Sequence, residues 1–238
     1  MEVAEGLAGR LEQALLRADA TAHEVEQLCR QAAQWGVRGV CVLPVHVARA
    51  RRCLEGSPVR VVAAVGFPLG ASSTLVKVVE AVQCVGAGAH EVDVVIALWA
   101  LKAGQLDEVE RDLQAVVRAV GPQVPVKAIL ETPYLSGPEK AAAALAARAC
   151  GARYVKTSTG FGPGGATVED VRLLREVLGD QVGVKASGGV RRARQALELL
   201  RAGADLIGTS HGFAILQELQ GLPALPELPE LPEGGAAP

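Results

Sequence analysis

The sequence predicts an α/β protein in which strands and helices alternate along a parallel sheet. Short apolar runs rich in β-branched residues lack polar alternation, as is typical of strands covered on both faces. Each run is followed by a longer amphipathic one, and most helical runs end at a glycine before the next strand. An open doubly wound sheet and a (β/α)8 barrel both fit this pattern, and 238 residues suit either.

Seven strands and six helices follow from these patterns in chain order. The predicted strands cover residues 37–43, 59–66, 91–96, 124–130, 154–158, 182–186 and 205–209. The predicted helices cover residues 22–35, 75–86, 106–120, 139–150, 168–178 and 194–202, with capping glycines at Gly36, Gly88, Gly121, Gly151 and Gly203. A barrel needs an eighth strand, and only residues 10–16 remain for it. That segment is rich in helix-forming residues, so the pattern alone does not decide between the two folds.

Composition excludes several classes of protein. A net charge of −2 and a pI near 6.1 argue against nucleic-acid binding. No apolar run reaches the ~20 residues that cross a bilayer. Charged residues at Glu2, Glu5 and Arg10 argue against a signal peptide, so we expect a cytoplasmic protein. The five cysteines and four histidines are scattered, which predicts neither a disulfide framework nor a metal site.

The last 18 residues differ from the rest of the chain. Proline recurs there at every third position, which is the polyproline II period: Pro223, Pro226, Pro229 and Pro232. We therefore expect one barrel-sized domain over residues 1–220 and a proline-rich flexible tail over residues 221–238. A P-x-x-P ligand for a partner domain is the alternative interpretation of the tail.

Two lysines within apolar strands carry the strongest chemical signal. Lys156 lies in "ARYVKTST" and Lys185 in "VGVKASGG", although the chain has only six lysines. A buried lysine is costly unless it is paired or neutral, and a second cation lowers the pKa of the first. The pair therefore predicts a neutral amine that attacks a carbonyl. The structural alternative is that both side chains reach solvent at the strand ends.

Other residues in apolar strands are candidates for supporting roles. Asp93 lies in "HEVDVVIAL", where a carboxylate needs a cationic partner, and the lysines are the obvious candidates. Lys127 in "PVKAILE" raises the same question, with Glu131 as its candidate partner. Cys41 lies in the middle of a strand and fits the core better than a nucleophilic role.

Glycine-rich segments follow three of the later strands. Residues 160–165 match G-x-G-x-x-G, but the acidic residue that a dinucleotide site requires is absent. We therefore expect a phosphate monoester to be held by backbone N–H groups, as in the loops after strands 7 and 8 of a barrel. Simple turn glycines are the alternative. The candidate phosphate-binding residues are Thr159, Gly160, Gly188, Gly189, Gly208 and Ser210.

Several motifs together resemble the deoxyribose-phosphate aldolase family. "VKAILET", "YVKTSTGFGPGGAT", "VKASGGVR" and "GADLIGTS" occur in order, and the resemblance covers residues 11–214. It implies a (β/α)8 TIM barrel without metal or cofactor that reversibly cleaves 2-deoxy-D-ribose 5-phosphate into D-glyceraldehyde 3-phosphate and acetaldehyde. It also implies that Lys156 forms the Schiff base, that Lys185 keeps it neutral, and that Asp93 acts as acid and base.

The head of the chain departs from this family. "LEQALLRA" stands where the family reads like "IDHTLLKP", with Glu12 for aspartate, Gln13 for histidine and Ala14 for a hydroxyl residue. The resemblance makes this segment the first strand, and we expect Glu12 to point into the barrel near Lys185.

A barrel that has lost turnover and serves a binding or regulatory role, and a Schiff-base lyase with a shifted substrate, are the alternative functions. The expected ligand is a phosphorylated sugar or aldehyde, and a homodimer is the candidate assembly.

Overall fold

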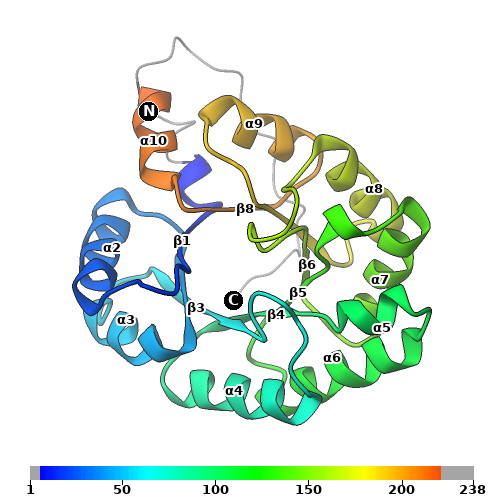
Figure 1. Cartoon of the computed structure of the whole chain (residues 1–238). Coiled ribbons are helices and arrows are strands. Elements are labelled where there is room, and N and C mark those ends of the chain that lie inside the picture. Colours follow the sequence, from blue (N-terminus) through cyan, green and yellow to red (C-terminus); the bar gives the residue numbers. More distant parts are fainter. Residues whose placement is uncertain (1–5, 221–238) are drawn as a thin grey trace.

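The computed structural model describes residues 6–220, which form a closed barrel of eight parallel strands in sequence order (Figure 1). The strands are β1 (Leu11–Leu15), β2 (Gly39–Val42), β3 (Arg60–Val65), β4 (Glu91–Val95), β5 (Val126–Ile129), β6 (Tyr154–Lys156), β7 (Gly183–Ser187) and β8 (Leu206–Thr209). Because β1 pairs with both β2 and β8, the sheet has no edge, and the open doubly wound alternative is wrong. The proline-rich tail predicted over residues 221–238 lies outside the described residues.

Helices surround the barrel and follow its strands (Figure 1). They are α2 (Ala22–Trp35), α3 (Val47–Cys53), α4 (Thr74–Gly86), α5 (Leu98–Lys102), α6 (Leu106–Val120), α7 (Gly137–Ala149), α8 (Val168–Leu178), α9 (Ala193–Arg201) and α10 (Gly212–Gln220), with 3-10 turns η1 (Pro44–His46) and η2 (Thr132–Tyr134). The predicted bounds of α2, α6 and α8 are confirmed, and the five predicted capping glycines all have positive φ. The sequence analysis missed α3, α5 and α10, because segments of five to nine residues show too little periodicity. Within residues 6–220, no helix combines the length and apolarity needed to cross a membrane.

The head of the chain forms β1 despite its helical composition. Glu12 is in register with Gly39 of β2 and Gly208 of β8. Gln13 is buried and donates from Nε2 to the Ser210 carbonyl oxygen at 2.9 Å, while its Oε1 accepts from the backbone N–H of Gly212 at 2.7 Å. Pairing on both sides and these contacts outweigh a local preference of less than ~1 kcal/mol per residue. The predicted first strand is therefore confirmed.

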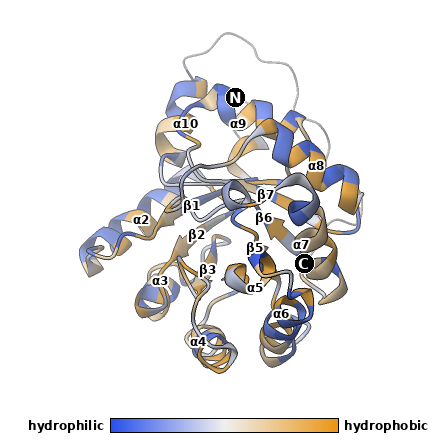
Figure 2. Ribbon diagram, turned by 45° about the vertical axis from the view of Figure 1, so that its right-hand side comes forward, coloured by the Kyte–Doolittle hydropathy of each residue, from blue (hydrophilic) through white to orange (hydrophobic). Residues whose placement is uncertain are grey.

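The strands separate two different interiors. Their outward side chains pack against the helices in one apolar core, and Figure 2 shows hydrophobic strands inside a ring of helices with mixed hydropathy. The inward side chains include many charged groups. Because side chains alternate along a strand, Glu91 and Asp93 face the barrel interior while Val92 and Val94 join the outer core. The barrel thus encloses a charged cluster that an apolar shell shields from water.

Candidate active site

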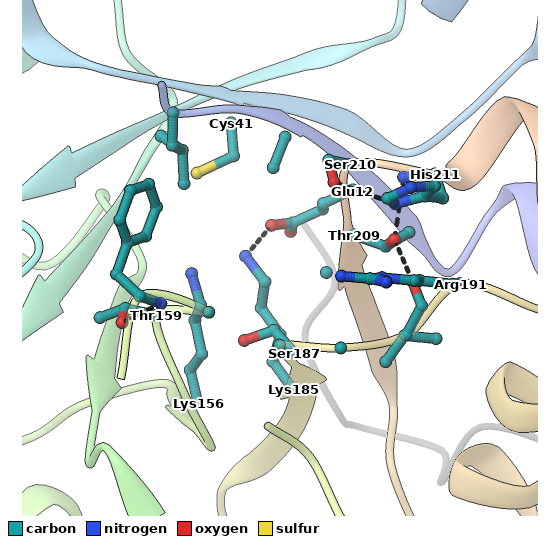
Figure 3. Close-up of a pocket in the computed structure, with 18 of the residues that line it drawn as sticks. Glu12, Cys41, Lys156, Thr159, Lys185, Ser187, Arg191, Thr209, Ser210 and His211 are labelled. Carbon is teal, nitrogen blue, oxygen red and sulfur yellow. Dashed lines mark hydrogen bonds and ion pairs between the residues drawn. The ribbon is translucent and has the colours of Figure 1, made fainter. Parts of the chain in front are cut away.

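A cavity of about 260 Å³ opens at the carboxyl ends of the strands, where (β/α)8 barrels carry their active sites. Lys156 and Lys185 extend side by side into it, and Glu12 reaches Lys185 from the opposite wall (Figure 3). Cys41 also lines the cavity, whereas Asp93 and Lys127 are fully buried and do not line it. The fold therefore gathers the predicted chemical residues from six different strands.

Asp93 connects the three lysines at the base of the cavity. Its Oδ2 accepts from Lys156 Nζ at 2.8 Å and from Lys185 Nζ at 2.6 Å, and its Oδ1 accepts from Lys127 Nζ at 3.0 Å. Burial alone would raise the pKa of Asp93, but the three lysines hold it well below its ordinary value. The carboxylate is therefore ionised and lies within proton-transfer distance of both cavity lysines.

The surroundings of Lys185 keep its side chain charged. Burial disfavours its charged form, but Asp93 and Glu12 offset this and raise its pKa. Lys156 shares the same Asp93 oxygen and has no second carboxylate in ion-pair contact among the described residues. The Lys185 ammonium therefore lies beside the Lys156 amine, with one Asp93 oxygen between them. The geometry thus suits Lys156 as the nucleophile and Lys185 as its cationic neighbour.

Removal of the Lys185 charge should move the pH dependence of the reaction. In Lys185→Leu, the reacting centre loses the cation that Asp93 and Glu12 hold beside it, and a neighbouring cation disfavours the protonated form of an amine. The rising limb of the pH–rate profile should move upward, and the maximal rate should fall. Initial rates measured between pH 5 and pH 10, at intervals of about one pH unit, test this prediction. A profile of unchanged shape and lower height would show that the two lysines are not coupled.

Glu12 lies in the barrel as predicted. Its carboxylate is fully buried, pairs with Lys185 and Arg38, and lies 3.4 Å from Lys127 Nζ. Burial alone would raise the pKa of Glu12, but these cations lower it. Gly208 makes room for this arrangement, because a Cβ there would lie 2.8 Å from Lys185 Cε. Glu12 therefore supplies Lys185 with a second anionic partner.

A second carboxylate, which the sequence analysis missed, lies below Asp93. Glu91 accepts from Lys127 at 2.5 Å, Arg38 at 2.6 Å and Arg60 at 3.0 Å. Burial opposes its ionisation, yet Lys127 and Arg38 lower the pKa of Glu91 to about 2. Its place two residues before Asp93 on one strand was the available signal, since such residues share a face.

The predicted pairing of Lys127 with Glu131 is wrong. Lys127 contacts Asp93, Glu91 and Glu12 instead. Four residues of extended chain span about 13 Å, so Glu131 lies beyond the end of β5 while Lys127 lies deep in the barrel. The Glu131 carboxylate accepts from Thr159 instead.

The candidate phosphate-binding residues lie around the cavity mouth, at the ends of β6, β7 and β8 and in the loops that follow them. The residues that line it include Thr159, Gly160, Gly188, Gly189, Gly208 and Ser210. Arg191, which was not among the predicted residues, also lines the cavity on the same side as Ser210 (Figure 3) and directly follows the "VKASGGV" segment. The two glycine loops pack backbone to backbone, because a Cβ on Gly165 would overlap the Gly188 carbonyl oxygen. The wall therefore offers backbone N–H groups and a guanidinium, which suit a phosphate monoester.

Cys41 and metal-binding side chains are the remaining candidates for a chemical role. The Cys41 thiol lies 3.9 Å from Asp93 Oδ2, and burial, with Asp93, raises its pKa to about 11. A thiol in this state is a poor nucleophile, in agreement with the predicted core position. Across residues 6–220, no three histidine, cysteine or acidic side chains form a group that could hold a metal ion.

Comparison with known proteins gives consistent matches. The DeoC/LacD family aldolase model matches residues 10–218. The deoxyribose-phosphate aldolase of Methanothermobacter thermautotrophicus is 48% identical over 218 residues, which cover 91% of this chain and 96% of that protein. That of Coprothermobacter proteolyticus is 49% identical over 88% of this chain and 95% of its own length.

Solved structures agree with these sequence relatives. A tetrameric deoxyribose phosphate aldolase from Aeropyrum pernix is 34% identical, with a TM-score of 0.86 and 92% of each chain covered. A structure described as "QR15, an Aldolase" is 39% identical, also with a TM-score of 0.86, and the match covers 90% of this chain and 96% of that chain.

Proposed function

This chain belongs to the DeoC/LacD aldolase family, and we propose on that basis that it reversibly cleaves 2-deoxy-D-ribose 5-phosphate into D-glyceraldehyde 3-phosphate and acetaldehyde. The chain is an aldolase, a carbon–carbon lyase. One observation supports a Schiff-base mechanism most directly: Lys156 and Lys185 share a single oxygen of the buried Asp93 carboxylate. An enzyme of this kind needs one neutral amine, one fixed positive charge and one proton acceptor within reach of each other.

In the proposed mechanism, the neutral Lys156 amine attacks the substrate aldehyde carbon, and loss of water leaves an imine. The imine withdraws electrons while Asp93, directly or through water, takes the proton of the substrate hydroxyl. The carbon–carbon bond then breaks, releasing D-glyceraldehyde 3-phosphate and leaving an enamine on Lys156. Asp93 returns a proton to the enamine carbon, and water hydrolyses the resulting imine to acetaldehyde and the free amine. Apart from water, the side chains of the protein supply every group that these reaction steps require.

The side of the cavity that Arg191 lines suits the phosphorylated half of the substrate. Arg191 supplies positive charge there, and Gly188 and Gly189 line the cavity without side chains of their own. The altered head does not remove a partner from Lys185, since Glu12 contacts it. This contact supports an active enzyme over a barrel that has lost turnover.

Borohydride trapping tests the mechanism. The protein is incubated with acetaldehyde and sodium borohydride, and its intact mass and peptide map are measured. We expect one N-ethyl group, located on Lys156. Turnover of 2-deoxy-D-ribose 5-phosphate, measured against the unphosphorylated sugar, then tests the substrate. Modification elsewhere would overturn the role of Lys156, and equal turnover of both sugars would overturn the phosphate site.

We also propose that the chain forms a homodimer through α4. This helix has its charges on the inner side: Lys77 is buried and donates to Asp112 at 2.6 Å, and Glu80 accepts from the Gly66 N–H. Apart from Gln83, which is polar but uncharged, its exposed side chains are apolar, namely Leu75, Val76, Val79 and Val82. An uncharged patch can meet its own copy across a two-fold axis without charge repulsion. The tetrameric relative from Aeropyrum pernix supports self-association in this family.

A charge placed in the α4 patch should separate the subunits. Val79→Lys should convert a dimer into a monomer in size-exclusion chromatography with light scattering, because two buried lysines would oppose each other. Leu145→Lys, which alters an exposed leucine of α7, is the matched control and should leave the mass unchanged. A native chain that is monomeric at ~100 μM would contradict the proposal.

A further inference from the structure

Glu131 has an unusual backbone conformation at the edge of the active site. It is the one non-glycine residue with positive φ among residues 6–220, at φ 55° and ψ 58°. The β5–β6 pairing continues on both sides of it, because the Leu130 N–H donates to the Lys156 carbonyl oxygen and the Thr132 N–H donates to that of Thr157, each at 2.9 Å. Such strain persists only where the surroundings determine it, and it concentrates at functional sites. Glu131 is thus held opposite the backbone of the candidate Schiff-base lysine.

The Glu131 side chain is a buried carboxylate that uses neutral donors. It is 3% exposed, and no lysine or arginine of the described chain forms an ion pair with it. Its two oxygens accept from the Thr159 N–H, each at 3.2 Å, and Oε2 also accepts from Thr159 Oγ1 at 2.5 Å. Burial of a carboxylate without a cation is costly, so this arrangement needs a reason beyond stability.

The contacts of Thr159 extend to the cavity mouth. Its hydroxyl donates to Glu131 and accepts from the Phe161 N–H at 3.1 Å. A Cβ on Gly162 would lie 3.2 Å from Glu131 Oε1, so the carboxylate lies directly beneath this loop. The loop after β6 therefore rests on one carboxylate.

Phe161 connects the loop after β6 to the other side of the cavity. It lines the cavity, and its ring meets the edge of Phe67 with centroids 5.3 Å apart and planes at 86°. Phe67, from the loop after β3, packs against the buried cluster of Cys41, Val62 and Ala64, of which Cys41 also lines the cavity. Two loops on opposite sides of the barrel thus meet through this aromatic pair.

We infer that Glu131 is a positioning residue of the aldolase reaction, whose carboxylate fixes Thr159 and, through the Thr159 hydroxyl, Phe161. The inference rests on the proposed function, because it assigns this loop to the wall beside the Lys156 imine. Held in place, the loop closes that wall and presents Thr159 to the phosphorylated substrate. A misplaced loop leaves the Lys156 amine intact but orients the substrate poorly.

Two variants separate the carboxylate from the strained backbone. Glu131→Gln keeps the size but lacks the second acceptor oxygen, and Glu131→Gly relieves the strain but removes the side chain. Both should raise the KM for 2-deoxy-D-ribose 5-phosphate about 10-fold or more, with a smaller loss in kcat. Borohydride trapping of Lys156 with acetaldehyde should continue near the native rate. Hydrogen exchange at the Thr159 and Phe161 amides should accelerate in both variants.

The matched comparison is Thr159→Val, which breaks the same contact from the other side. Its combination with Glu131→Gln should be no worse than the more damaged single variant, because both remove one interaction. Native KM and native amide exchange in Glu131→Gly would overturn the inference. Loss of Lys156 trapping in Glu131→Gln, together with loss of one limb of the pH–rate profile, would also overturn it, since Glu131 would then transfer protons. The native protein could fail to turn over the sugar phosphate while the variants still show faster hydrogen exchange at the Thr159 and Phe161 amides. In that case the proposed substrate is wrong and the positioning role stands.

Discussion

Replacement of Lys156 by arginine should abolish turnover. The guanidinium keeps a positive charge near Asp93, but it cannot lose a proton and form an imine. Because the covalent route disappears with the amine, we expect a loss of about 10⁴-fold or more in kcat. Steady-state rates with 2-deoxy-D-ribose 5-phosphate measure this loss. The same variant should give no borohydride adduct with acetaldehyde.

A matched control is available on α7. Lys140 makes a partly buried ion pair with Asp170 at 2.6 Å and does not line the cavity. Lys140→Arg therefore makes the same chemical change outside the site and should retain activity. Equal thermal midpoints for the two variants would show that the loss at Lys156 is chemical. Near-native turnover in Lys156→Arg, or an adduct on another lysine, would contradict the mechanism.

Most of the barrel could be predicted because its strands are short runs of mainly apolar, β-branched residues without regular polar alternation. The exception was β1, where leucine, glutamate, glutamine and alanine favour a helix and closure of the sheet overrides that preference. Such an effect depends on β2 and β8, which a local pattern cannot contain. Only the family resemblance identified the segment as a strand.

Local sequence patterns also predicted only part of the active site. Lys156, Lys185 and Asp93 could be identified because a charged residue within an apolar strand is conspicuous. Arg38 could not be identified although the predicted strand 37–43 includes it, because it lies at the start of that strand and its contacts with Glu12 and Glu91 appear only when the barrel closes.

The contacts of Glu131 could not be predicted for a different reason. Its spacing from Lys127 suggested an ion pair, and no local pattern predicts the left-handed backbone that turns it toward Thr159. Pairwise reasoning along the sequence therefore found the reacting groups and missed the residues that hold them.

Replacement of Asp93 by asparagine should separate imine formation from proton transfer. Lys127 retains Glu91 and Lys185 retains Glu12, but Lys156 loses its carboxylate partner. An amide cannot carry a proton between the substrate hydroxyl and the enamine carbon, so turnover should fall about 10²-fold or more. In D₂O, the native enzyme should exchange the methyl protons of acetaldehyde through the enamine. The variant should lose this exchange while Lys156 still forms a borohydride adduct.

Glu91→Gln distinguishes chemistry from stability. Glu91 belongs to the same buried cluster but contacts Lys127, Arg38 and Arg60 rather than Lys156. Breaking a buried ion pair costs about 3–5 kcal/mol, so both variants should unfold at a lower temperature. If the cluster served only folding, both would lose methyl exchange in proportion to their folded fraction. Because Asp93 alone shares its oxygen with both cavity lysines, the exchange should disappear in Asp93→Asn and persist in folded Glu91→Gln. An effect of Asp93→Asn confined to KM would instead assign that carboxylate to substrate binding.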